Sequence, residues 1–344
     1  MRRRAIAYAL LSAALFGAST PVAKVLLGAT SPWLLAGLLY LGSGFGLLVM
    51  RIATRAAPAR LASNERGWLA GAIVAGGVVA PVLLMYGLVR MPASGASLLL
   101  NAEGLFTALI AWFAFRENFD RRIAAGMLAI VAGATLLSWP GEASFSSAWP
   151  ALAILAACLA WGLDNNLTRR VSLSDATFIA MAKGLAAGGV NVALACMAGS
   201  TLPPAAPLAG ALGIGFLGYG VSLTLFVLAL RDLGTARTGA YFSTAPFAGA
   251  LIALLFLGDP LTLQLGLAAA LMAAGVWLHV SERHEHAHTH EALEHAHEHE
   301  HDVHHQHAHD GAVPSGVRHT HAHRHEPMTH AHPHFPDAHH RHEH

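Results

Sequence analysis

Charged residues are scarce in this 344-residue chain, where Asp, Glu, Lys and Arg together make up 12% of the sequence. Soluble domains carry roughly 25% charged residues, so the composition excludes an ordinary soluble protein and indicates a chain with several membrane spans. The only two lysines, Lys24 and Lys183, lie within apolar runs. Histidine is absent before His279, although the chain contains 24 histidines. An apolar region is therefore followed by a histidine-rich tail.

Cysteine is equally rare, and several motifs are missing. Cys158 and Cys196 both lie in apolar runs, so we expect neither a disulfide nor a cysteine-type zinc site. No GxxxxGK[ST] phosphate-binding loop occurs, which argues against an ATP-driven pump. The spans show no nucleophile beside a base, so we expect no enzymatic activity and no required cofactor. The first apolar run is longer than the roughly 7–15 residues of a signal-peptide core, so we expect it to be retained.

The apolar region divides into segments long enough to cross a membrane. A hydrocarbon core roughly 30 Å thick needs about 20 apolar residues per helix. The sequence predicts ten such spans, at 5–27, 32–52, 67–89, 94–115, 123–139, 149–168, 176–198, 208–230, 238–257 and 263–280. We therefore expect an all-α integral membrane fold whose partner is the lipid bilayer, and no nucleic-acid partner.

The arginines of the loops predict the orientation of the chain. If the N-terminus is cytoplasmic, the outside loops receive only Arg90. The cytoplasmic side receives Arg2, Arg3, Arg4, Arg51, Arg55, Arg60, Arg66, Arg116, Arg121, Arg122, Arg169, Arg170, Arg231 and Arg237. Because basic residues accumulate in cytoplasmic loops, we expect a multi-pass protein of the inner or plasma membrane with both termini in the cytoplasm.

The region of the spans contains an internal repeat. Residues 90–120 and 231–262 each run from a polar loop through one span into an acidic turn, and the acidic residues of these turns, Glu117 and Asp259, lie 142 positions apart. Five spans per half is an odd number, so the second half must insert upside down. We expect two inverted five-helix repeats, 1–140 and 148–280, with a substrate site between them near the middle of the membrane, and a disordered cytoplasmic tail, 281–344.

Polar patches interrupt two spans at corresponding positions. FGASTPVAK at 16–24 and WGLDNNLTR at 161–169 each begin with an aromatic residue and a glycine and end with a basic residue. Pro21 removes an intrahelical hydrogen bond, and hydroxyls such as that of Thr20 can satisfy the freed carbonyl, so we expect a helix break there. Paired interruptions of this kind indicate the substrate site of a transporter.

These features resemble the EamA-like exporters of the drug/metabolite transporter superfamily. The best-matching stretches are the aromatic-glycine first span of each half and ALRDLGTARTGAYFSTAPFAGALIALLFLGDPLT in the second half. The resemblance implies ten spans in two inverted repeats and an efflux function. A basic residue in the second span of a half is matched by Lys183 but not by its counterpart Tyr40. The proline usual in the fourth span is present as Pro246, and Glu103 occupies that region of the first half.

Ionisable side chains inside spans are energetically costly and are functional candidates. Lys24, Glu103, Asp164 and Lys183 comprise two acids and two bases, which can neutralise one another across the site. Alternatively, Glu103 or Asp164 exchanges a proton during transport. Lys183 is either a cargo contact or the partner of Glu103, and Lys24 is either an interfacial anchor or a ligand. Other residues expected along the substrate or coupling-ion path are Asn101, Asn165, Asn166, Asn191, Phe16, Trp161 and Tyr241.

The tail is rich in His-x-His sequences with interspersed acidic residues. Neutral imidazole is a ligand for zinc, nickel, cobalt and copper, so we expect loose binding of divalent ions. The candidate ligands are His284, His286, His288, His290, His295, His297, His299, His301, His304 and His305. The alternative is a neutral low-complexity tail without a function.

The sequence leaves two functions open. The first is a secondary transporter that exports a small metabolite or an amino acid by alternating access. The second has the same fold but exports zinc, nickel or cobalt, with the tail feeding or regulating it. The spans carry few carboxylates to hold a dehydrated metal ion, which favours the first. A homodimer also remains open.

Overall fold

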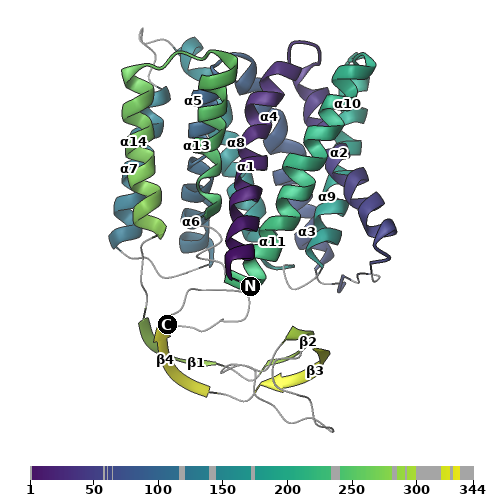
Figure 1. The fold of residues 1–344 in the computed structure, drawn as a ribbon, viewed down its shortest axis with the longest axis vertical. Coiled ribbons are helices and arrows are strands. Elements are labelled where there is room, and N and C mark those ends of the chain that lie inside the picture. The colour runs from purple at the N-terminus through teal and green to yellow at the C-terminus, as the bar shows by residue number, and fades with distance from the viewer. Residues whose placement is uncertain are drawn as a thin grey trace. The chain divides into compact units, whose positions relative to one another are not determined.

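The structure is a computed structural model, and it describes residues 2–56, 59, 61–63, 65–115, 121–138, 145–171, 175–233, 241–280, 285–290, 293–299, 319–325 and 328–333. The chain forms two units, Met1–Glu282 and Arg283–His344. All regular structure in the described part of the first unit is helical (Figure 1). It is a bundle of helices that run roughly parallel or antiparallel to one another.

The first half of the bundle contains five helical segments. Two are single helices, α1 (Arg2–Leu26) and α2 (Pro32–Ala53), and a third is α7 (Arg121–Ser138). The other two are composite. One consists of α3 (Arg66–Ala72), the π-helix η1 (Ile73–Val79) and α4 (Ala80–Val89), and the other of α5 (Ala93–Leu99) and α6 (Ala102–Phe115).

The second half has the same order of elements. The single helices are α8 (Phe145–Arg169), α9 (Ala176–Met197) and α14 (Leu263–Val280). One composite segment consists of α10 (Ala205–Ile214), the π-helix η2 (Gly215–Val221) and α11 (Ser222–Leu233). The other contains α13 (Ala245–Ile252) and the π-helix η3 (Ala253–Leu257), preceded by a turn at Ser243 and Thr244.

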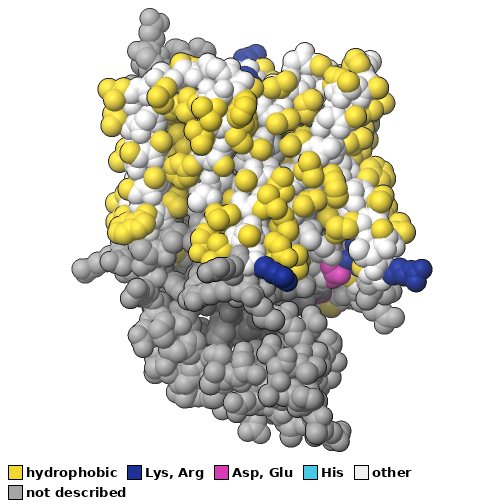
Figure 2. All heavy atoms as spheres, in the orientation of Figure 1, with side chains coloured by type: hydrophobic (Ala, Val, Ile, Leu, Met, Phe, Trp, Pro, Cys, Tyr) yellow, Lys and Arg dark blue, Asp and Glu magenta, His cyan; other side chains and the backbone are white. Residues whose placement is uncertain are grey.

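These elements account for the ten expected spans. Seven described helical segments are long and apolar enough to cross a membrane, and three shorter apolar helices cover 124–138, 245–257 and 263–278. Their described ends agree with the predicted ends to within about one helical turn. Figure 2 shows hydrophobic side chains spread over the viewed face of the bundle and basic side chains near its ends. This is the surface expected of helices that face lipid.

The two halves pack through pairs of corresponding helices. α2 lies against α9, and α7 lies against α14 (Figure 1). The first contact is close because small residues face each other: a Cβ added at Gly184 would lie 2.6 Å from the backbone nitrogen of Gly44. Such small-residue contacts hold membrane helices together through backbone proximity.

The break expected at Thr20 and Pro21 is absent, because α1 continues through both residues as one helix. Pro21 removes only the hydrogen bond to the Gly17 carbonyl, and this carbonyl lies in the tight contact between α1 and α13. A Cβ added at Gly249 would lie 2.6 Å from the Gly17 oxygen. Neighbouring helices can therefore accommodate the proline, as is common in membrane helices. The polar patch at 161–169 likewise lies within one continuous helix, α8.

Helix irregularities occur instead in other spans, at corresponding positions of the two halves. The π-helices η1 and η2 begin at Ile73 and Gly215, which are 142 positions apart. A turn at Leu100 and Asn101 separates α5 from α6, and the turn at Ser243 and Thr244 precedes α13. π-Helical segments often mark functional sites, and broken helices often form transporter binding sites.

We expected no secondary structure in the tail, but its described residues form four short strands: β1 (Glu285–His290), β2 (Leu293–His299), β3 (His319–His325) and β4 (Met328–Pro333). β1 pairs with β4 and β2 with β3, both antiparallel. The His-x-His alternation has the two-residue period of a strand, and composition alone carries no information about this period. Of the candidate tail ligands, His284, His301, His304 and His305 lie outside the described residues.

Candidate functional site

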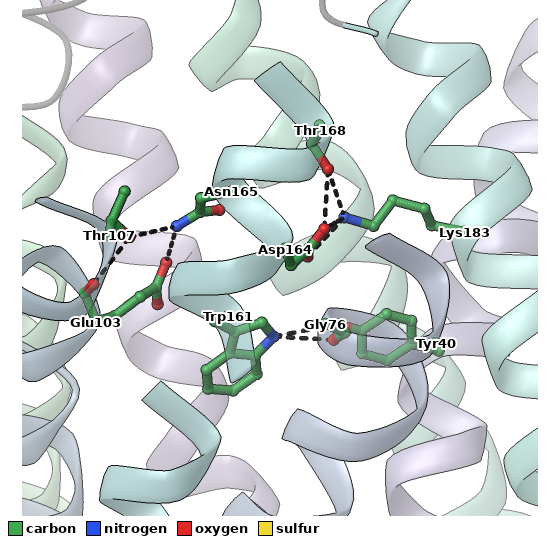
Figure 3. A network of polar contacts seen from close by, with 9 residues as sticks. All are labelled: Tyr40, Gly76, Glu103, Thr107, Trp161, Asp164, Asn165, Thr168 and Lys183. Atoms are coloured by element: carbon green, nitrogen blue, oxygen red, sulfur yellow. Dashed lines mark hydrogen bonds and ion pairs between the residues drawn. The ribbon is translucent and has the colours of Figure 1, made fainter. Parts of the chain in front are cut away.

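A buried ion pair joins α8 to α9. The Lys183 ammonium donates to both carboxylate oxygens of Asp164, at 2.6 and 2.7 Å, and Thr168 donates to Asp164 Oδ1 at 2.8 Å (Figure 3). The side chains of Lys183 and Asp164 are 14% and 7% exposed. Lys183 is therefore the partner of Asp164 and not, as one expectation had it, of Glu103.

The π-helix η1 provides the space for this pair. A Cβ at Gly76 would collide with the Asp164 carboxylate, so only glycine fits at this position. η1 also leaves a carbonyl without a backbone partner. In η1 a backbone N–H donates to the carbonyl five residues earlier, as Ala80 does to Ala75. The donor to the Gly76 carbonyl in this pattern would be residue 81, but Pro81 has no N–H.

Two aromatic side chains satisfy the Gly76 carbonyl. The Tyr40 hydroxyl donates to it at 2.6 Å, and the Trp161 indole N–H donates to it at 2.9 Å (Figure 3). Trp161 was expected in the path and is 6% exposed. From the sequence, Tyr40 was predicted only as the repeat counterpart of Lys183, and no role was predicted for Gly76. The combination of Gly76, Gly77 and Pro81 within one span was the available signal.

Glu103 lies at the first turn of α6, directly after the helix interruption, and its partners are neutral. Asn165 donates through Nδ2 to Glu103 Oε1 at 2.9 Å and to Thr107 Oγ1 at 3.1 Å (Figure 3). Thr107 in turn donates to the Glu103 backbone carbonyl at 2.8 Å. In the described part of the chain Glu103 forms no salt bridge. The carboxylates of Asp164 and Glu103 thus have different bonding partners, an ammonium for Asp164 and an amide for Glu103.

Three other predicted residues have structural partners. Asn166 donates to the carbonyls of Thr107 and Gly162, at 3.0 and 2.8 Å. Asn191 accepts from the Trp33 indole and donates to the Gly77 carbonyl. Asn101 donates to the Leu98 carbonyl at the end of α5. All three side chains are buried, so their amides stabilise helix ends and helix contacts around the site.

Aromatic rings connect the two halves beside this network. Phe16 lies 5.7 Å from Tyr219 and 5.4 Å from Phe242, and Tyr219 lies 5.5 Å from Tyr40, all between ring centroids. Phe16 thus belongs to an aromatic row that reaches Tyr40. Tyr241 packs instead against Ala5, Ala9 and Ala229, and the neighbouring Phe242 joins the aromatic row.

Lys24 lies apart from these residues and binds backbone carbonyls. Its ammonium donates to Leu88 and Val89 at the end of α4, at 2.6 and 2.9 Å. At the same end of the bundle, the Ser94 N–H donates to Asp259 at 2.8 Å, which connects α5 to the turn after η3. We call this the far end, and the opposite end, with Arg4, Arg51, Arg66 and Arg170, the arginine end. Lys24 therefore connects α1 to α4 through backbone carbonyls, which differs from the interfacial anchor that the sequence suggested.

The inward side of α8 becomes exposed toward the arginine end. The lipid-facing stripe of this helix is marked by Leu152, Leu159 and Leu163, each more than 40% exposed. Asn165 is also exposed, yet it lies about 200° around the helix from Leu163. On that inward side, Cys158 and Trp161, nearer the far end, are buried. The site around Glu103 and Asn165 is therefore accessible on the side of the arginine end.

No group of three or more His, Cys, Asp and Glu side chains that could hold a metal ion occurs among the residues that the structure describes. The carboxylates of Glu103 and Asp164 bind an amide and an ammonium, respectively. The described bundle thus offers an acidic site without the ligand set of a dedicated metal centre.

Comparisons with known proteins agree with this architecture. The model of the EamA-like transporter family matches residues 3–139 and again residues 148–281. An uncharacterized transporter of Methanothermobacter thermautotrophicus is 28% identical over 283 residues, which cover 76% of this chain and 82% of that protein. A crystal structure of a protein superposes with a TM-score of 0.60 at 19% identity, covering 79% of this chain and 95% of the other, and shows the same fold.

Proposed function

The chain belongs to the EamA-like transporter family, and from this premise we propose that it is a secondary transporter that exports a small organic metabolite by alternating access. The observation that carries the proposal is the Glu103–Asn165 site, which is polar, accessible from one end and located beside a helix interruption. Exposure on the arginine end supports an inward-facing state, because basic loops favour the cytoplasm.

Glu103 is the carboxylate best suited to exchange a proton. Asp164 is bound through both oxygens by Lys183, so protonating it would leave a buried ammonium without a counterion. Glu103 has only neutral partners, and its protonation leaves no unpaired charge. We therefore assign the coupling step to Glu103 and a structural role to the Asp164–Lys183 pair.

The far end supports the alternating-access step. There the bonds of Lys24 to the α4 carbonyls and of Ser94 to Asp259 close the bundle, while the arginine end exposes Asn165. Export requires the opposite arrangement at another point of the cycle. These few polar contacts are the ones that must break for the far end to open.

The test compares the exported metabolites of cells that produce the wild type, E103Q or E65Q. Among the described residues, Glu65 accepts a hydrogen bond only from the nearby Ala62 N–H at the start of α3, so E65Q is a matched control. We expect E103Q to insert normally and to abolish export, with E65Q unaffected. Unchanged export by a membrane-inserted E103Q would refute the role of Glu103.

We also propose that the histidine-rich tail binds zinc, nickel, cobalt or copper loosely, as a buffer or regulator. Its density of imidazoles supports this, and the lack of a three-ligand cluster in the described bundle disfavours metal as the cargo. Truncation after Val280 should remove most bound metal from the purified protein while metabolite export persists. Metal export that depends on Glu103 would instead support the metal-exporter alternative.

A further inference from the structure

The hydrogen-bond donors around Glu103 are already used within the protein. The Thr107 hydroxyl uses its one proton to donate to the Glu103 backbone carbonyl, so toward Asn165 it is an acceptor. Asn165 Nδ2 has two protons and donates one to Thr107 Oγ1 and one to Glu103 Oε1. The remaining groups are acceptors, Glu103 Oε2 and Asn165 Oδ1, for which the described residues provide no donor. A ligand at this site must therefore bring its own N–H or O–H donors.

The charge of the site also limits which ligands can bind, because it favours a cation. Lys183 directs its ammonium to both oxygens of Asp164, and Lys24 binds carbonyls at the far end. Within the described part of the chain, ionised Glu103 thus has no cation as direct partner. A carboxylate in an apolar bundle is costly without a counterion, so a cationic ligand gains most from this position and an anionic ligand is repelled.

An aromatic row lies beside the acceptors. Phe16, Tyr219 and Tyr40 are in ring contact in that order. The Tyr40 hydroxyl shares the Gly76 carbonyl with Trp161, which lies one helical turn before Asn165 in α8. The faces of aromatic rings attract cations, and the rings provide apolar contact area. The row therefore suits the apolar body of a ligand whose charged head binds Glu103.

The repeat makes the site one-sided. With the 145-position offset that relates Gly17 to Gly162, Asp164 and Asn165 correspond to Ser19 and Thr20. The charged groups are thus confined to the side of α6, α8 and α9, and the opposing side, with α1 and η2, contributes Phe16 and Tyr219. A ligand with one cationic end and one apolar end matches this division.

We propose that the cargo is an amphipathic amine, a protonated primary or secondary amine with an aromatic or branched apolar body. This inference rests on the proposed function, since it names the substrate class of the same site. The ammonium donates to Glu103 and to Asn165 Oδ1, and the apolar body lies against the row of Phe16 and Tyr219. A bare divalent cation fits less well, because two oxygens fall short of the 6–8 oxygen ligands that calcium prefers.

The experiment measures binding to the full-length protein in lipid nanodiscs by calorimetry. Four probes share a phenyl ring and differ at the head: phenethylamine, N-methylphenethylamine, trimethylphenethylammonium and hydrocinnamate. We expect both amines to bind about tenfold or more tightly than hydrocinnamate, and the quaternary ammonium to bind more weakly than the amines because it has no N–H donor. Equal or tighter binding of hydrocinnamate would overturn the proposal.

Variants assign the binding to the two acceptors. E103Q should lower phenethylamine affinity about tenfold or more, since it removes a charge-assisted hydrogen bond, and E65Q should leave it unchanged. N165L keeps the Glu103 carboxylate but removes Oδ1 together with the Nδ2 donor to Glu103, so it provides a second test of the site if E103Q fails to fold. Unchanged amine affinity in folded N165L and E103Q would contradict the assignment.

Failure of this inference and failure of the proposed function give different results. If the wild type exports an organic acid or a neutral solute through Glu103 and none of the amines binds, the substrate class is wrong and the transporter function stands. If the amines bind at Glu103 but E103Q and the wild type release the same metabolites, the site assignment stands and the proposed export function is wrong.

Discussion

At the scale of single residues, the carboxylates of Asp164 in α8 and Glu103 in α6 have different chemical surroundings. Asp164 accepts two bonds from an ammonium and one from a hydroxyl, whereas Glu103 accepts one bond from an amide. The ammonium of Lys183 neutralises the carboxylate of Asp164, whereas the bonding partner of the Glu103 carboxylate is neutral. The chemistry of transport is therefore expected at Glu103.

The Asp164–Lys183 pair should matter most when only one partner is removed. K183M leaves a buried carboxylate without a counterion, which costs about 3–5 kcal/mol of unfolding free energy. The double variant D164N/K183M removes both charges and should recover most of that loss, because the introduced asparagine would still accept from Thr168. Thermal unfolding of the purified protein in detergent measures both variants. A double variant that is less stable than K183M would show that the pair contributes more than charge neutralisation.

Gly76 should tolerate no side chain. In G76A the new methyl group would collide with the Asp164 carboxylate, and such overpacking costs about 1–3 kcal/mol. Gly189 in α9 has open space around its Cα, so G189A is a matched control. We expect G76A to lower the thermal midpoint and to impair export, with G189A close to the wild type. Equal midpoints for G76A and the wild type would mean that η1 can shift away from α8.

Several site residues were predictable from composition alone, because a charged or amide side chain in an apolar span stands out. Glu103, Asp164, Lys183 and Asn165 were identified in this way. Their pairing was not predictable, since Lys183 lies 19 positions from Asp164 and the approach of α8 to α9 depends on the three-dimensional packing. The bonds of Tyr40 and Trp161 to Gly76 depend on the π-helical register, which residue types do not specify.

At the scale of elements, irregularities in the helices create the site. η1 frees the Gly76 carbonyl and makes space for Asp164, and the interruption between α5 and α6 precedes Glu103. Hydropathy predicts where helices cross the membrane, because the length of the apolar run is set by the bilayer. It carries no information about hydrogen-bond register within a run. For that reason the spans were predicted correctly, while the break was assigned to Pro21 and the actual interruptions were missed.

The clamp between α2 and α9 at the arginine end should be pH-dependent. Asp175 precedes the span of α9, accepts from Arg51 at 2.6 Å and caps the helix through Phe178 N–H. Burial acts to raise the pKa of Asp175, but hydrogen bonds from Thr177, Arg51 and Phe178 outweigh it and hold the pKa below its usual value. A carboxylate whose pKa is lower in the folded state stabilises the fold at pH values above its unfolded-state pKa of about 3.9. This stabilisation is lost as the pH falls through the folded-state pKa.

We therefore expect D175N to be less stable than the wild type near neutral pH, by about 1 kcal/mol or less because the side chain is one-third exposed. Asparagine caps helices as well as aspartate does, so the substitution removes mainly the charge. The difference in thermal midpoint should shrink as the pH drops below about 4 and vanish when wild-type Asp175 is protonated. A difference that stays constant with pH would assign the loss to packing.

At the scale of the whole molecule, correspondence between the halves coexists with chemical asymmetry. The matched positions of η1 and η2 and the packing of α2 on α9 relate the two halves. The charged groups of the site nevertheless belong to one side, because Ser19 occupies the repeat position of Asp164 and the region of the second half that corresponds to Glu103 contains Pro246. A repeated scaffold gives two arrangements of similar energy, and unequal side chains bias which one a bound ligand favours.

The orientation and the accessible end of the molecule can be tested together with cysteine reactivity. Native Cys196 is exposed near the end of α9, at the far end, whereas native Cys158 is buried. If the arginine end is cytoplasmic, a membrane-impermeant maleimide added to intact cells should label Cys196. In a C196S background, N165C should react only when the reagent reaches the cytoplasmic side, as in inverted vesicles, because the inward side of α8 is exposed toward the arginine end.

Addition of a transported solute should shift this pattern. Native Cys158 reports this shift in the C196S background, because it is buried on the inward side of α8 nearer the far end. Alternating access predicts that Cys158 becomes reactive from the outside when the far end opens, and E103Q should suppress this change because the ligand no longer biases the two states. A cysteine at Ser63, which is exposed just before α3 at the arginine end, serves as the control for reagent access from the cytoplasmic side. Labelling of N165C from the outside alone would reverse the orientation, and Cys158 labelling that never changes with solute would contradict the alternating-access proposal.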